Sequence, residues 1–320
     1  DHTVEVQFLN DAYGGTQQTD RNLYVLNATY DGAPLTPSSA SLLSAGTATF
    51  KRITSTLRIS LWVYDVHLGE VLSDTVNKVA DLGFNAIITD AHPSNVAQDK
   101  ATLAKFIAKG IGVYFLLTRG GPTIDALTQA QIDAFAAWAT AIKNENGLLG
   151  YFISDEADNV GGTRTTKYAS LVSAVNGADS VHPTVMVSNG NWSSDPSIPS
   201  GWRTDARTYL TAGDDTYLFS PGADAVKVAS MMTELATLFA GGLGIFIASW
   251  WVPNDSRFPM ATAQQISTAA LASKINSRVR ELAAWSWRHY DDTLAVRCVG
   301  NDATLYARVK EAIASIRAQW

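Results

Sequence analysis

"LRISLWVYDVHLGEVLSDTVNKVADLGFNAIITDAH" covers residues 57–92 and contains the pattern that decides the fold. An apolar run rich in β-branched and aromatic residues predicts a strand at 57–65. Apolar residues at three- and four-residue spacing then predict a helix at 72–83, which ends in glycine, the residue that most readily adopts a left-handed C-cap. A second apolar run predicts another strand at 86–92. The stretch is therefore a β–α–β unit, which is typical of parallel sheets.

The same alternation continues to the C-terminus. Further helices are expected at 99–110, 128–145 and 225–242. The complete set of expected strands is 57–65, 86–92, 112–120, 150–158, 184–190, 216–224, 243–251 and 281–289. A doubly wound sheet would also alternate strands and helices, but the count of eight and the polar residues at the strand ends favour a (β/α)₈ TIM barrel. The fold class is thus α/β, with the barrel at 57–320 preceded by a short β-rich N-terminal segment.

Composition narrows the classes of function. The net charge of −6 offers no basic excess for neutralising phosphates, so we expect no nucleic acid partner. No apolar stretch reaches the length of a membrane span, so we expect no membrane partner. The single cysteine, Cys298, excludes an internal disulfide framework and is expected to be a small buried residue. The 9 Trp and 11 Tyr residues supply flat apolar rings of the kind that bind sugars.

In such barrels the active site lies at the carboxyl ends of the strands. Carboxylates there supply acid and base, amides and arginine bind hydroxyl groups, and indole rings stack on sugars. Glycoside hydrolysis needs two carboxyl groups, or one together with a group of the substrate. The residues at these ends that we select as site candidates are Asp65, Asp90, His92, Arg119, Asp155, Glu156, Asn189, Tyr217, Trp250, Trp287 and His289. Together they predict a carbohydrate site.

The stretch "YFISDEAD" at 151–158 is the most specific of these strand ends. Asp155 and Glu156 are adjacent, and side chains alternate along a strand, so one of the two is expected to point into the barrel mouth. A charged pair at the end of an apolar strand costs desolvation energy unless it is used or paired. We expect Glu156 to be a general acid. Alternatively, the pair caps the following segment or forms an ion pair with Arg119 or Arg288.

This layout resembles the (β/α)₈ glycoside hydrolases. In their largest clan a general-acid Glu follows an Asn at the end of the fourth strand, and a nucleophilic Glu ends the seventh. Glu156 matches the first position, with Asp155 in place of Asn, but "IASWW" at 247–251 contains no Glu. The resemblance therefore leaves two alternatives. Another carboxylate, with Asp155, Asp90 and Asp65 as candidates in that order, is the second catalytic group. Otherwise the reaction is substrate-assisted, as in hexosaminidase-like barrels, where Asp steadies an acetamido group and Glu is the acid.

The remaining candidates are expected to bind the substrate. His92 follows Asp90 by two residues, and with Asp65 the pair could bind a metal, but the paired-histidine signature of metal-dependent barrel hydrolases is missing, so we expect no cofactor for catalysis. Trp250 is adjacent to Trp251, so at most one of them is expected to face the mouth. The expected substrate-binding residues are His92, Arg119, Asn189, Tyr217, Trp250, Trp287 and His289.

A second resemblance concerns "NDAYGGTQQTDRNLYV" at 10–25, a polar turn between expected strands. It is similar to the signature of calcium-dependent xylan-binding modules, "NDxYGG…DRNLYV". The resemblance implies Asp11 and Asp20 as calcium ligands, since carboxylates are hard oxygen donors. The alternative is a polar hairpin turn without metal. Because only the C-terminal half of such a module is matched, we predict a partial β module at 1–35 and a linker at 36–56.

These patterns lead to one expected function and two rivals. We expect a secreted, bacterial-type glycoside hydrolase, extracellular or periplasmic, that acts on a polysaccharide or oligosaccharide. The first rival is a non-catalytic barrel that binds glycans, motivated by the missing carboxylate of the seventh strand. The second is a metal-dependent polysaccharide hydrolase or deacetylase that uses Asp65, Asp90 and His92.

Overall fold

The structure is a computed structural model of the 320-residue chain. It divides into two units, Asp1–Thr56 and Leu57–Trp320. The residues that it describes are 2–9, 21–25, 28–30, 33–34, 40–52, 57–64, 72–119, 124–154, 164–188, 206–210, 229, 233, 243–248, 250–253, 260–274, 279–285 and 296–320.

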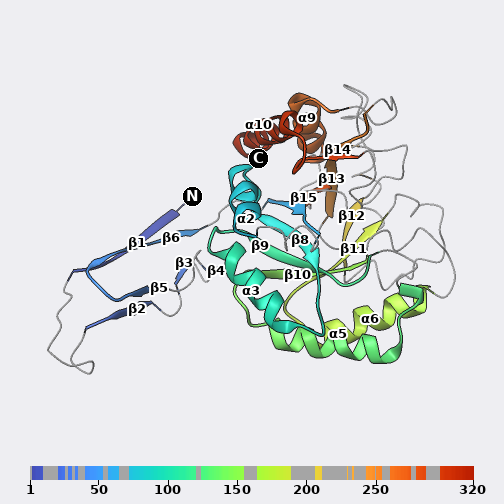
Figure 1. The fold of residues 1–320 in the computed structure, drawn as a ribbon, viewed down its shortest axis with the longest axis horizontal. Helices are drawn as coiled ribbons and strands as arrows, with labels where there is room; N and C mark the ends of the chain where they lie inside the picture. The colour runs from blue at the N-terminus through green and yellow to red at the C-terminus, as the bar shows by residue number, and fades with distance from the viewer. Residues whose placement is uncertain are drawn as a thin grey trace. The chain divides into compact units, whose positions relative to one another are not determined.

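The second unit is built on a curled parallel sheet (Figure 1). Each strand is hydrogen-bonded to the next in a closed ring, and β15 returns to pair with β7. Every pairing in this ring is parallel. The ring consists of β7 (Arg58–Trp62), β8 (Ala86–Asp90), β9 (Gly112–Leu116), β10 (Leu148–Ser154), β11 (Thr184–Ser188), β12 (Ala206–Leu210), β13 (Leu243–Ala248) and β15 (Val279–Trp285).

Helices follow most of these strands in the chain, as a repeated β–α unit requires. The described helices are α2 (Leu72–Asp81), α3 (Val96–Ile107), α5 (Gln129–Ile142), α6 (Arg164–Ala178), α9 (Ala263–Ser273) and α10 (Ala303–Gln319). The helix expected at 225–242 lies outside the described residues, apart from Ala229 and Thr233. The fold is therefore mixed α/β, and the complete (β/α)₈ repeat stays a prediction for the segments that follow β11 and β12.

One strand differs from its expected position. The sixth strand of the ring is β12, Ala206–Leu210, which pairs with β11 on one side and β13 on the other. The expected strand at 216–224 lies outside the described residues. The sequence of β12, "ARTYL", is short and half polar, so its hydrophobic pattern is weaker than that of "TYLF" at 216–219. Residues 206–210 form the sixth strand because they pair with β11 and β13, and their hydrophobic periodicity alone would not predict a strand.

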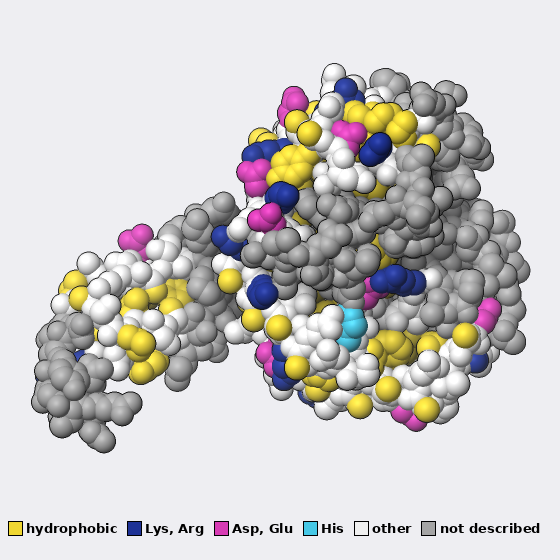
Figure 2. All heavy atoms as spheres, in the orientation of Figure 1, with side chains coloured by type: hydrophobic (Ala, Val, Ile, Leu, Met, Phe, Trp, Pro, Cys, Tyr) yellow, Lys and Arg dark blue, Asp and Glu magenta, His cyan; other side chains and the backbone are white. Residues whose placement is uncertain are grey.

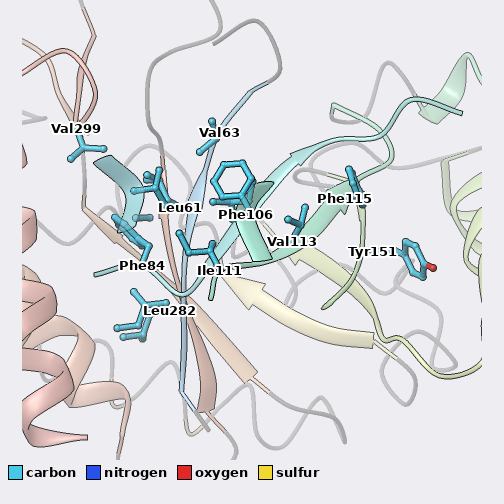
Figure 3. Packing of buried hydrophobic residues seen from close by; sticks show 14 of the residues in the cluster. Leu61, Val63, Phe84, Phe106, Ile111, Val113, Phe115, Tyr151, Leu282 and Val299 are labelled. Carbon is cyan, nitrogen blue, oxygen red and sulfur yellow. The ribbon is translucent and has the colours of Figure 1, made fainter. Parts of the chain in front are cut away.

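Alternation along the strands divides the apolar core into two layers. Inside the ring lie Trp62, Ile88, Tyr114 and Phe152, with ring centroids 5.2 Å apart for Tyr114 and Phe152. The residues between them in sequence form the outer layer against the helices (Figure 3). This outer layer includes Leu61, Val63, Val113, Phe115, Tyr151 and Leu282, together with Phe106 of α3. The described inner side chains therefore pack against one another, as in barrels whose ligand sites lie at the ends of the strands.

The expected helix boundaries are set by local chemistry. Thr128 and Gln131 form a capping box at the start of α5, and Thr262 with Gln265 does the same for α9. The left-handed glycine expected after the first helix is present, since Gly83 has a φ angle of 88°. Cys298 is buried, as expected for a small apolar residue.

The described residues of the first unit form three pairs of antiparallel strands. β1 (His2–Phe8) pairs with β6 (Gly46–Arg52), β2 (Leu23–Val25) with β5 (Ala40–Leu42), and β3 (Thr29–Tyr30) with β4 (Ala33–Pro34). Residues 40–52, expected as loop or linker, thus contribute two strands. The registers Val4↔Phe50 and Val6↔Ala48 place apolar residues on one face of the β1–β6 ribbon. Asp11 and Asp20 lie outside the described residues.

Candidate active site

The structure describes the side chains of three predicted site residues, Asp90, His92 and Arg119. Asp90 ends β8, and His92 and Arg119 follow the carboxyl ends of the neighbouring strands β8 and β9. Trp250 belongs to β14 (Trp250–Trp251), but its side chain is not described. The other candidates, Asp65, Asp155, Glu156, Asn189, Tyr217, Trp287 and His289, lie outside the described residues.

Asp90 and Arg119 form a two-pronged ion pair at this end of the barrel. Asp90 is the last residue of β8. Since side chains alternate along a strand, it lies on the same face as Ala86 and Ile88, which belong to the inner layer. Arg119 donates from Nε to Oδ1 of Asp90 at 2.7 Å and from Nη2 to Oδ2. The Asp90 side chain is 11% exposed, whereas that of Arg119 is 47% exposed. Because both carboxylate oxygens accept from one planar guanidinium, the pair has a fixed geometry.

Two aromatic residues connect this pair to the neighbouring strands β7 and β15. The guanidinium carbon of Arg119 lies 5.1 Å from the ring centroid of Tyr64, within cation–π range. The indole Nε1 of Trp285 donates to the Tyr64 hydroxyl at 3.0 Å. Tyr64 follows β7 and Trp285 ends β15, so the four side chains come from the ends of four adjacent strands. We call Tyr64, Asp90, Arg119 and Trp285 the mouth network.

His92 is held by a separate buried carboxylate. Asp99, in the first turn of α3, is 1% exposed and accepts from the backbone N–H of His92 at 2.8 Å. Its Oδ1 lies 2.7 Å from His92 Nδ1, and its Oδ2 accepts from the indole of Trp138 at 2.7 Å. A carboxylate at this distance favours a proton on Nδ1. Through these hydrogen bonds Asp99 links the loop between β8 and α3 to Trp138 of α5. The side chain of His92 is one-quarter exposed.

The adjacent tryptophans of β14 differ in their surroundings. β14 pairs with β16 (Arg297–Cys298) just beyond the end of β13. Trp251 packs against the outer core layer, and its indole donates to Asp302 at 2.9 Å, the residue that caps α10. Trp251 is therefore part of the contact between β14 and the helical layer.

Two other polar clusters lie at the opposite end of the barrel. Glu281 of β15 is 1% exposed, accepts from the Tyr114 hydroxyl and lies 3.7 Å from Nε of Arg58, the first residue of β7. Asp179, after α6, accepts from the Tyr151 hydroxyl at 2.6 Å and lies 2.7 Å from His182 Nδ1. Contacts at the amino ends of barrel strands serve stability rather than catalysis.

The surroundings of Asp179 change its ionisation. Burial raises the pKa of its carboxyl group, but hydrogen bonds from Tyr151, from the backbone N–H of Val181 and from His182 lower it by more. The net result is a pKa below the ordinary value for aspartate. Burial, with the neighbouring carboxylate, raises the pKa of Tyr151. Asp179 is therefore an ionised carboxylate at neutral pH.

Four residues of the mouth network and of the Asp99 cluster were not among the predicted site residues, namely Tyr64, Asp99, Trp138 and Trp285. Tyr64 and Trp285 could have been found from their positions at strand ends, but the alternation that points them inward depends on the observed register. Asp99 and Trp138 lie on helices 39 residues apart, and nothing in their local sequence marks them.

A metal site finds no support in the part of the chain that the structure describes. Within it, no group of three or more His, Cys, Asp and Glu side chains is arranged to hold an ion. The oxygens of Asp90 bind Arg119, and Nδ1 of His92 faces Asp99. None of the described helices is both long and apolar enough to cross a membrane.

Comparison with known proteins shows similarity at the level of structure alone. No family model matches the sequence, and no curated protein matches it. A GH5_18 protein from Streptomyces cattleya, solved with Manb1-4GlcNAc, has a TM-score of 0.62 at 13% identity. The match covers 82% of this chain and 81% of that chain. A GH5_18 protein from Bifidobacterium longum subsp. infantis has a TM-score of 0.61 at 10% identity, with 82% of this chain and 79% of that chain covered.

A third similar structure extends over nearly the whole chain. The GH2 beta-galacturonidase from Eisenbergiella tayi, bound to galacturonate, has a TM-score of 0.60 at 12% identity and covers 98% of this chain and 71% of its own. Coverage of 98% includes most of the first unit as well as the second. The described chain therefore has the fold of glycoside hydrolases of GH5_18 and GH2.

Proposed function

We propose that the protein is a glycoside hydrolase that acts on a polysaccharide or oligosaccharide, and that residues 57–320 form a complete (β/α)₈ barrel. The observation that carries the proposal is the mouth network, in which carboxylate, guanidinium, phenol and indole groups meet at the carboxyl ends of four adjacent strands. Such a mixture binds sugar hydroxyls and stacks on sugar rings. The fold shared with glycoside hydrolases supports the same function.

Glu156 is the proposed general acid. It follows Ser154, the last residue of β10, by two positions, and Ser154 is buried. Phe152 belongs to the inner layer, but the register of β10 against β11 shifts between Phe152 and Ser154, so the proposal for Glu156 rests on its position after this strand end. β10 pairs with β9, whose end carries Arg119. A general acid at that position would lie beside the mouth network.

The second catalytic group is proposed among Asp155 and Asp65, with substrate assistance as the alternative. Asp90 is the remaining candidate. Its two oxygens both accept from Arg119, which suits a supporting role better than attack on the sugar. The substrate would be bound by Arg119, His92, Trp250 and Trp285.

Further substrate contacts are proposed from the sequence alone. They would come from Asn189, which follows β11 in the chain, Tyr217, which follows β12, and Trp287 and His289, which follow β15. Calcium binding by Asp11 and Asp20 is likewise a proposal from the resemblance of residues 10–25. We also propose that the protein is secreted by a bacterium.

A glycan-binding barrel without activity is the second candidate function. The observation that favours it is the end of β13, where Ala248, Ser249 and Trp250 follow one another without a carboxylate. A metal-dependent hydrolase or deacetylase has less support, because the polar atoms of Asp90 and the Nδ1 of His92 contact other protein groups.

Release of reducing sugar from a panel of plant and microbial polysaccharides separates these functions, with Glu156→Gln run beside the wild type. A hydrolase with this general acid should lose at least about a hundredfold in kcat in the variant. Release that is equal in both proteins would assign the acid elsewhere. Binding of a polysaccharide without release by either protein would support the glycan-binding barrel instead.

A further inference from the structure

The two-stranded ribbon of β14 and β16 carries an aromatic and a basic side chain that the proposed function does not use. We propose that Trp251 and Arg297 form an outer subsite that binds one sugar unit of a polysaccharide chain whose scissile bond lies in the barrel mouth. The inference rests on the proposed glycosidase function and deepens it, because it assigns the substrate to the class of polymers rather than of short glycosides.

The ribbon continues directly from a ring strand at its carboxyl end. β13 ends at Ala248, whose register partner is Trp285 of the mouth network. Trp251 follows three residues later. Three residues of extended chain span at most about 11 Å, so Trp251 lies within about this distance of Ala248. A ligand that occupies both the mouth and the surroundings of Trp251 must therefore be longer than one sugar ring.

The strand register places Trp251 and Arg297 on the same face of the ribbon. β14 pairs antiparallel with β16, with Trp251 opposite Arg297 and Trp250 opposite Cys298. Directly opposite residues of an antiparallel pair have side chains on one face, with Cβ atoms about 5 Å apart. Cys298, the next residue along β16, is buried, whereas Arg297 is exposed and Trp251 is partly exposed. Trp251 and Arg297 thus lie on the outward face of the ribbon.

Hydrogen bonds fix the orientation of the indole before any ligand binds. Nε1 of Trp251 donates to Oδ2 of Asp302 at 2.9 Å, and Oδ1 of Asp302 accepts from the backbone N–H of Leu305 at 2.9 Å. The backbone N–H of Cys298 donates to Oδ1 of Asn301 at 2.7 Å, which ties β16 to the start of α10. A side chain that is already ordered loses little freedom when it binds, and this favours affinity.

The chemistry of these groups matches a sugar ring. An indole offers a flat apolar surface for the C–H face of the ring, and guanidinium N–H groups donate to hydroxyl oxygens. Val252 and Pro253 follow Trp251 and are also partly exposed, so they extend the apolar surface. In Figure 2, hydrophobic, basic and acidic side chains lie close together over the region of β14, α9 and α10. Such a mixture suits a hydroxylated ring better than a purely apolar ligand.

Two substitutions of Trp251 separate stacking on a sugar from support of the fold. Trp251→Phe and Trp251→Leu both lose the hydrogen bond to Asp302, but only Phe retains a flat ring. The Kd for a polysaccharide should rise about tenfold for Trp251→Leu and about threefold or less for Trp251→Phe, because aromatic contacts carry much of the binding energy at such sites. Arg297→Ala removes exposed donors and should raise the Kd about threefold.

Affinity gel electrophoresis of the full chain in soluble xylan, β-glucan and galactomannan measures these constants. Lys109→Ala is the matched control and should keep the wild-type Kd, because Lys109 is exposed between α3 and β9, at the amino ends of the strands. For a polysaccharide that the wild type cleaves, kcat/KM relative to that for an aryl glycoside of the same sugar should fall by the same factors. Urea-induced unfolding establishes that each variant is folded.

A larger loss of affinity for Trp251→Leu than for Trp251→Phe, together with a loss for Arg297→Ala, would support the outer subsite, even in a barrel that binds without cleaving. Equal losses for the two Trp251 variants would assign this residue to packing and overturn the inference. Wild-type constants in all the folded variants would overturn it while leaving the glycosidase intact. A wild type that neither binds nor cleaves these polysaccharides would remove the proposed function, and this inference with it.

Discussion

Asp99 offers the sharpest test of how the barrel mouth is supported. Its carboxylate is 1% exposed and accepts from three donors, the backbone N–H and Nδ1 of His92 and the indole of Trp138. Asp99→Ala removes the acceptor of all three hydrogen bonds, and the indole of Trp138, a residue that is itself 1% exposed, loses its partner. A buried donor left without a partner costs about 1–3 kcal/mol, so we expect a loss of about 3–5 kcal/mol in the free energy of unfolding.

Asp99→Asn should cost much less than Asp99→Ala. The amide oxygen can keep the bonds from Trp138 and the His92 backbone, both of which now go to Oδ2. The amide nitrogen would then face His92 Nδ1 and donate to it, which moves the imidazole proton to Nε2. We expect a loss of about 1–2 kcal/mol, because only the charge assistance of these hydrogen bonds is removed.

Urea-induced unfolding followed by tryptophan fluorescence measures both losses. The free energies of unfolding are compared between variants that have the same m-value. Asp133→Ala is the control, since Asp133 is exposed on α5 and accepts a hydrogen bond from Gln129 at 2.9 Å. It should change stability by less than about 0.5 kcal/mol. If Asp99→Ala were as stable as that control, the buried carboxylate would not be the acceptor that fastens this loop.

Three further predictions test the mouth network, the Asp179 cluster at the opposite end of the barrel and the backbone conformation of Gly150. Tyr64→Phe removes the hydroxyl that accepts from Trp285, and kcat/KM should fall by about tenfold with about 1 kcal/mol of stability lost; an unchanged kcat/KM would mean that Tyr64 serves packing alone. Asp179 has a lowered pKa in the folded state, so it stabilises the fold above the unfolded-state value near 3.8, and this stabilisation disappears as pH falls through the lower folded-state value. The deficit of Asp179→Asn in chemical unfolding should therefore be largest near neutral pH and shrink below about pH 4, and a deficit that is constant with pH would contradict this. Gly150→Ala should destabilise strongly, because Gly150 has a φ of 151° and an added Cβ would lie 2.4 Å from the Pro183 carbonyl oxygen, whereas Gly177→Ala in α6 meets nothing within 4 Å and should leave the melting temperature unchanged or raised.

Much of the strand order could be predicted because buried parallel strands are locally distinctive. The apolar runs at 57–65, 86–92 and 112–120 correspond to β7, β8 and β9, and the helices between them begin and end close to the expected positions. The expected strand at 216–224 was wrong as the sixth ring member, since β12 occupies that place. A short, half-polar strand has no strong periodicity, and its two neighbours stabilise it.

The candidate site was predictable only in part. Asp90, His92 and Arg119 were chosen because polar residues end apolar strands, and two of them, Asp90 and Arg119, do bind each other. Their pairing across 29 residues could not be inferred from the residues alone, because a strand-end position predicts an end of the barrel but no particular partner. The same holds for Asp99 and Trp138, which meet only because α3 and α5 pack side by side.

The sequence by itself determined the parallel strand and helix alternation, the burial of the strands and the end of the barrel at which polar residues collect. These properties depend on hydrophobic periodicity and capping, which act over a few residues. The tertiary structure alone decided that Tyr64 and Trp285, 221 residues apart, share a hydrogen bond. It also decided that Arg119 is fixed between Asp90 and Tyr64. Such contacts depend on the register with which β15 closes on β7, and register is set by the packing of the whole ring rather than by any one segment.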